Sequence, residues 1–112
     1  MQSKKVNVLG TEYSIDFREE KDDSKLSHYD GYCDDTTKQI VVEDYTNDKD
    51  TLSKGDLNAY AMSCLRHELI HAFLFESGLA QNSKWANNEE TVDWIARQFP
   101  KILEAFKQAE CI

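Results

Sequence analysis

The sequence is poor in proline and cysteine, and each shortage excludes certain kinds of protein architecture. Its single proline, Pro100, leaves no proline-rich stretch that could serve as a linker between domains. Cys33, Cys64 and Cys111 lie far apart and form no CxxC pair, which predicts reduced thiols and a cytoplasmic location. Residues 1–8 precede no long apolar stretch, so we expect neither a signal peptide nor a membrane anchor.

Long apolar runs and basic residues are also scarce. No run approaches the roughly 20 apolar residues that a membrane-spanning helix requires. The 13 basic residues are outnumbered by 21 acidic ones, and the formal net charge is −8. This balance argues against nucleic acid and anionic membranes as partners, because both are bound by clustered lysine and arginine. The 112 residues suit one domain, spanning 1–112, with one modest core.

The first part of the chain predicts β-strands between about residues 5 and 43. Apolar residues at 6, 8, 13, 15 and 17 alternate with polar ones, as in half-buried strands with a turn at Gly10-Thr11. A third strand is expected over 28–33 and a turn over 34–37. The fourth strand, 38–43, contains three consecutive β-branched residues, which indicates burial on both faces.

The second part predicts helices. A long helix over about 54–77 should begin near Ser53 or Asp56 and end at Gly78. Two C-terminal helices are expected within about 87–110. The first would be capped near Asn87 or Ser83, and Pro100 would separate it from the second. Strands followed by helices indicate an α+β fold, with an antiparallel or mixed sheet packed on the long helix. Four aromatic residues are assigned to the core: Trp85, Trp94, Phe99 and Phe106.

The long helix contains the sequence His67-Glu68-Leu69-Ile70-His71. Residues four apart lie on one face of a helix, so His67 and His71 can offer two imidazole nitrogens to one metal ion. Glu68 lies about 100° further round the helix, beside the metal without competing to bind it. Two ligands, an open position for water and a carboxylate to take its proton are the requirements of a zinc peptidase. Cys64, one turn before His67, is either an extra ligand or a small core residue.

A catalytic zinc ion needs a third protein ligand, and the following helix offers one. Glu89 comes 18 residues after His71, and the connection is long enough for the chain to reverse. Asp93 lies four residues beyond Glu89 on the same face, where it can orient a ligand histidine. Glu90 is the rival ligand, but it points about 100° away.

The pattern HExxH followed by Asn88-Glu89-Glu90-Thr91-Val92-Asp93 resembles the gluzincin metallopeptidases. The small size and early strands resemble their minimal members, the minigluzincins and the ImmA/IrrE-like metallopeptidases, over roughly residues 28–97. The resemblance implies a zincin-like fold in which His67, His71 and Glu89 bind one zinc ion, Glu68 is the general base and Asp93 orients a histidine. It also implies a metalloendopeptidase acting on a peptide or protein, for example on a narrow substrate such as a regulator.

The resemblance leaves the stabilisation of the oxyanion unassigned. Larger gluzincins supply a histidine or tyrosine from a further C-terminal domain. Here His28 and Tyr32 are the candidates, with Tyr29 and Tyr45 as other possible donors. By analogy, the strand before the helix would form the rim that pairs with an extended substrate: Tyr29, Asp30, Gly31, Tyr32 and Cys33.

Two other functions compete with catalysis. One is a catalytically silent protein of the same fold that acts as a binding module, for example a phage or mobile-element accessory protein. The other is a domain in which zinc is purely structural. The intact Glu68 favours the enzyme, because a structural site has no use for a base beside an open coordination position.

Overall fold

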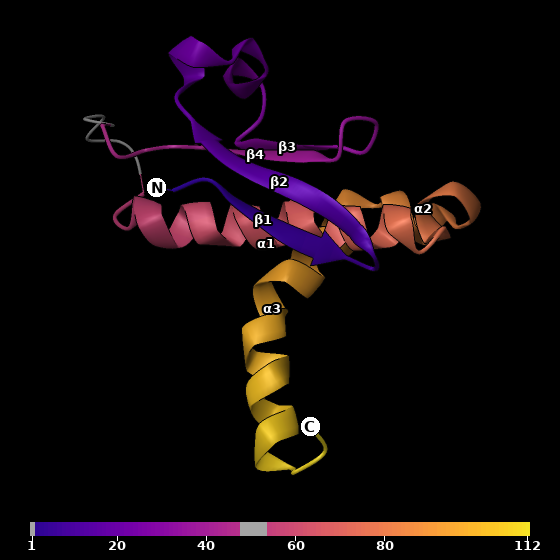
Figure 1. The fold of residues 1–112 in the computed structure, drawn as a ribbon. Helices are drawn as coiled ribbons and strands as arrows, with labels where there is room; N and C mark the ends of the chain where they lie inside the picture. The colour runs from indigo at the N-terminus through magenta and orange to yellow at the C-terminus, as the bar shows by residue number, and fades with distance from the viewer. Residues whose placement is uncertain (1, 48–53) are drawn as a thin grey trace.

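The computed structural model describes residues 2–47 and 54–112, and over these ranges the chain forms an α+β domain (Figure 1). A sheet of four strands precedes the helices, as the sequence predicts, but a short helix occupies part of the expected connection and one helix replaces the two expected at the C-terminus. The strands are β1 (Lys4–Val8), β2 (Thr11–Arg18), β3 (Gly31–Asp34) and β4 (Gln39–Glu43). The helices are α1 (Leu57–Glu76), α2 (Leu79–Asn82) and α3 (Glu89–Gln108). In the described ranges, no helix has the length and apolar character needed to cross a membrane.

The sheet is mixed, with strand order β1-β2-β4-β3. Strand β4 runs parallel to β2 and antiparallel to β3, so it is central, and Ile40, Val41 and Val42 are fully buried. This confirms the predicted burial on both faces. The third strand is shorter than expected. Residues 28–30 do not belong to it, because a 3-10 helix over Ser24–Ser27 ends at His28 and delays the extended backbone until Gly31.

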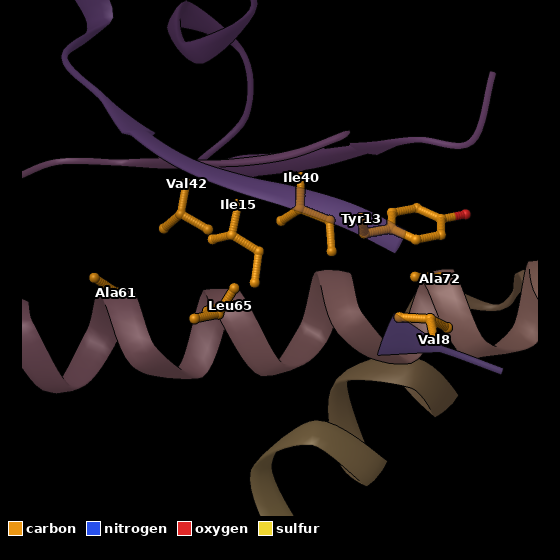
Figure 2. Close-up of a cluster of buried hydrophobic side chains, with 8 residues drawn as sticks. All are labelled: Val8, Tyr13, Ile15, Ile40, Val42, Ala61, Leu65 and Ala72. Carbon is orange, nitrogen blue, oxygen red and sulfur yellow. The ribbon is translucent and has the colours of Figure 1, made fainter. Parts of the chain in front are cut away.

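The core lies between the sheet and α1 (Figure 2). Alternate residues of the strands point toward the helix. The α1 residues that pack against them, four and then seven positions apart in sequence, lie on one face of the helix. These eight buried side chains are Val8, Tyr13, Ile15, Ile40, Val42, Ala61, Leu65 and Ala72. The two alanines let the helix approach the sheet closely, which brings the middle of α1 beside strand β3.

The ends of α1 follow from local signals in the sequence. The Asp56 side chain accepts a hydrogen bond from the backbone N–H of Ala59, as an N-cap does. Gly78 adopts a left-handed conformation with φ of 84°, which confirms it as the residue that ends the helix. The alternative start, Ser53, lies outside the described residues.

The predicted break at Pro100 is wrong, because α3 runs through Pro100 as one continuous helix. A proline inside a helix removes the N–H that would bond to the carbonyl four residues earlier. Here that carbonyl belongs to Ala96, and Arg66 of α1 donates to it from Nε at 2.9 Å. A side chain from the neighbouring helix therefore replaces the missing backbone donor. Helix α3 is capped by Asn88, which accepts from the N–H of Thr91, one residue later than expected.

The assignment of four aromatic residues to the core is also wrong. Helix α3 crosses α1 and then runs away from the sheet, so its C-terminal half stands clear of the domain (Figure 1). Only its first turns bury residues against the rest of the described chain, namely Val92 and Ala96. Phe99 and Phe106 lie on the C-terminal half, whereas Trp85 lies in the 3-10 helix Lys84–Asn87 and Trp94 in the first turns of α3. All four aromatic residues keep 43 to 60% of their surface exposed.

Candidate metal centre

Two histidines of α1 and the first residue of α3 meet at one point. His67 and His71 lie one turn apart on α1, and their Nε2 atoms are 3.2 Å from each other. Nε2 of His67 is also 2.9 Å from Oε2 of Glu89, and Nε2 of His71 is 2.9 Å from Oε1 of the same carboxylate. The three ligand atoms lie within 4.8 Å of one another, so these side chains could hold one metal ion.

The position of Glu89 depends on the start of α3. The Asn88 cap fixes the first turn of the helix, and Glu89 is its first residue. A second small core cluster then holds this turn against α1, with Leu74, Ala86 and Val92 buried in it. Local capping and apolar packing together bring a carboxylate to two histidines that precede it by 18 and 22 residues.

Asp93 lies behind His67. Its Oδ1 is 3.2 Å from Nδ1 of His67, so the ring N–H can donate to it and leave Nε2 directed at Glu89. Arg97, one turn further along α3, donates from Nε to Oδ2 of Asp93 at 2.6 Å. Burial opposes ionisation of Asp93, but the hydrogen bonds from Arg97 and His67 outweigh it and lower the pKa of Asp93. The carboxylate therefore stays charged and holds the ring of His67.

Glu68 occupies the face of α1 that points toward the sheet, between Leu65 and Ala72. A methyl group added at Gly31 of β3 would lie 3.5 Å from its Cγ, so the strand passes directly beside it. Within the described ranges, no hydrogen bond or ion pair holds the carboxylate. Burial is the main cause that raises its pKa to about 7; the charge of Glu89 adds to this and that of His67 opposes it.

Hollows lie on both sides of Glu68. One, of about 300 Å³, is bounded by Tyr29, Tyr60 and Arg97 and includes His67. The other, of about 550 Å³, lies toward Phe75 and includes His71 and Glu89. Gly31 and Glu68 border both hollows, and β3 is an edge strand of the sheet. An extended chain lying along β3 would therefore pass over Glu68.

The remaining predicted site residues differ in where they lie. His28 and Tyr29 border the first hollow but precede β3, and Asp30 also precedes it and accepts hydrogen bonds from the hydroxyls of Tyr45 and Tyr60. The Tyr32 hydroxyl donates to Asp23. Tyr32 borders the second hollow. Since side chains alternate along a strand and Cys33 packs into the core, however, the Tyr32 ring extends from the sheet face away from α1.

Cys64 is not one of the three converging ligands. It packs against the core cluster, and burial raises the pKa of its thiol to about 11. A neutral, half-buried thiol fits the alternative of a small core residue.

Sequence reasoning missed Tyr60 and Arg97, which both border the first hollow. The sequence does contain a signal for each. Tyr60 precedes His67 by seven residues, two turns along the same face of the helix. Arg97 extends the four-residue spacing of Glu89 and Asp93 by one further turn.

Comparison of the chain with protein-family models, with curated proteins and with solved structures finds no match.

Proposed function

We propose that the chain is a zinc-dependent endopeptidase of zincin-like fold, with His67, His71 and Glu89 as the zinc ligands. The observation that carries this proposal is the convergence of both imidazoles on one carboxylate. Their Nε2 atoms are 3.2 Å apart, and each lies 2.9 Å from a different oxygen of Glu89. Tetrahedral zinc with bonds of about 2.0 to 2.1 Å has ligand atoms about 3.3 Å apart, so the residues fit the ion.

The surroundings of the ligands favour zinc binding. Burial lowers the pKa of His71 against the opposing effect of Glu89, which favours the neutral imidazole that a metal requires. The contact between His67 and Asp93 leaves the other ring nitrogen of His67 for the ion. The same distances also suit a cluster without metal, in which one protonated imidazole, one neutral imidazole and a carboxylate form hydrogen bonds. Measured zinc content decides between a zinc site and such a cluster.

Glu68 is the proposed general base. Bound zinc would lower the pKa of a coordinated water and polarise the scissile carbonyl. Glu68 lies beside the ligands, borders both hollows and has no competing partner among the described residues. Its carboxylate can accept a proton from the attacking water and return it to the leaving amine. The free edge of β3 would hold an extended peptide by backbone pairing.

The experiment compares zinc content and cleavage of a generic unfolded protein in the wild type and in single variants. Glu68→Gln should keep one equivalent of zinc and lose cleavage by about 100-fold or more. Glu89→Ala should lose zinc. Glu90→Ala is the matched control, because it removes the adjacent carboxylate of the same helical turn and should keep both zinc and activity.

Three results would contradict these assignments. Equal cleavage by the wild type and Glu68→Gln would refute the mechanism. Full zinc affinity in Glu89→Ala, with loss in Glu90→Ala, would reverse the choice of third ligand. One equivalent of zinc without cleavage of any unfolded substrate would favour the silent binding module over the enzyme.

A further inference from the structure

The free half of α3 carries an apolar face that the described chain covers only in part, since Ile102 and Leu103 are half-buried and the two phenylalanines are exposed. Val92 and Ala96 are buried against α1, and the same face continues outward through Phe99, Ile102, Leu103 and Phe106. Phe99 and Phe106 are 45% and 43% exposed. This outer half extends away from the sheet and from α1 (Figure 1). Apolar residues in that position lose the stabilisation that burial would provide, at about 25 cal/mol per Å².

An apolar groove lies at the base of this half-helix, in the angle between α1 and α3. Its walls are formed by Leu69, Ile70 and Phe73 of α1 and by Ala96 and Phe99 of α3. Phe73 is 42% exposed in it. Arg66 also borders the groove, but its Nε is engaged by the Ala96 carbonyl. The groove therefore fits an apolar side chain.

The exposed face has the symmetry of a surface that binds its own copy. Its four residues read Phe-x-x-Ile-Leu-x-x-Phe from 99 to 106, and reversing the order only exchanges the isomers Ile and Leu. A two-fold axis between Ile102 and Leu103 would pair Phe106 of each copy with Phe99 of the other. Phe99 lines the groove, and seven residues of helix place Phe106 about 10 Å from it along the axis. Phe106 of each copy would therefore enter the groove of the other copy.

The distribution of charge favours the same partner. The chain as a whole has a net charge of −8, which opposes association of two copies. Arg97 is paired with Asp93, and beyond it residues 98–112 carry two basic and two acidic side chains. One of the acidic residues, Glu104, lies about 150° round the helix from the centre of the apolar face. The side-chain charges of the outer half therefore cancel, and two copies can pair there away from the acidic remainder of the chain.

We propose that α3 is a homodimer interface, in which two copies pair their outer half-helices antiparallel and each seats Phe106 in the groove of the other. Such an interface is isologous, so each side chain contributes twice. The proposal does not depend on the zinc site, and its measurements do not use metal or peptidase activity.

The test is the molar mass of the intact chain by sedimentation equilibrium between about 1 μM and about 1 mM. The wild type should rise from the mass of one chain, 12.9 kDa, to that of two. Phe106→Glu and Phe73→Ser should weaken dimerisation by about 30-fold or more. Gln108→Glu is the matched control, since it adds the same charge two residues away on the opposite side of α3 and should dimerise like the wild type.

A cysteine experiment tests the antiparallel register. In a Cys111→Ser background, Leu103→Cys lies beside the two-fold axis and should form a disulfide between copies under mild oxidation. Lys101→Cys, on the opposite side of the helix, should not. A wild type that remains monomeric over the whole range would overturn the proposal and leave the face to a different protein or to a lipid surface. A dimer unaffected by Phe106→Glu, or cross-linked equally at both positions, would overturn the interface.

Discussion

The hydrogen bond from Arg66 to the Ala96 carbonyl should offset much of the free energy of folding that is lost by having a proline inside α3. Pro100 provides no N–H for this carbonyl, and Ala96 is fully buried, so water cannot replace the donor easily. Leaving a buried acceptor unsatisfied costs about 1 to 3 kcal/mol. Arg66→Met keeps most of the aliphatic stem and removes the donor. We expect it to lower the free energy of unfolding by about 1.5 to 2 kcal/mol.

The decisive measurement is the same substitution in a Pro100→Ala background. Alanine restores the backbone N–H, so Arg66→Met should then cost less than about 0.5 kcal/mol, and the coupling energy should exceed about 1 kcal/mol. Urea unfolding followed by circular dichroism, at one low protein concentration, gives all four values. Lys101→Met is the control, because it removes an exposed positive charge from the same helix and should change stability by less than about 0.5 kcal/mol. An equal cost of Arg66→Met in both backgrounds would refute the reasoning.

Three further predictions concern the sheet, the site and the start of α3. Hydrogen bonds, of which the one from Lys38 has the largest effect, lower the pKa of Glu76 from 4.5 to about 2. The stabilisation that they give the folded state is complete above pH 4.5 and is lost as the pH falls toward 2. Glu76→Gln should therefore flatten this part of the profile of Tm against pH. Gly31→Ala should lower Tm and reduce peptide cleavage, since its methyl group would lie 3.0 Å from a β4 carbonyl and 3.5 Å from Glu68; unchanged values of both would contradict this. Asn88→Ala should cost about 1 kcal/mol in thermal unfolding and weaken zinc binding in a titration, whereas a loss of stability with unchanged zinc affinity would separate the cap from the site.

Local chemistry explains what the sequence could predict. The position of His67 and His71 on one face follows from helical geometry alone, and the ends of α1 follow from an aspartate and a glycine next to them. The burial of β4 follows from three adjacent β-branched residues. The return of Glu89 to the two histidines was predictable because the connection after His71 is long enough for the chain to reverse. Each of these inferences uses residues close together in sequence or a simple limit on chain length.

The wrong predictions have non-local causes. The rule that proline ends a helix assumes that nothing replaces the lost donor, but Arg66 supplies one from 30 residues before Ala96. Residues 28–30 have strand-like composition, yet the 3-10 helix before them determines where β3 can begin. Neither a partner from another helix nor the preceding turn can be inferred from the local pattern.

The exposed aromatic residues show a different limit. The period of Val92, Ala96, Phe99, Leu103 and Phe106 indicates that one face of α3 is apolar along its whole length, and this is correct. It does not indicate what covers that face. Helix α1 covers the first two turns of α3, but the two helices cross there, and the outer half of α3 extends beyond α1 (Figure 1). Assigning the whole face to the core assumed that a chain covers its own apolar surface. The outer end of this face has a near-palindromic sequence, so a second copy of the chain can cover it instead.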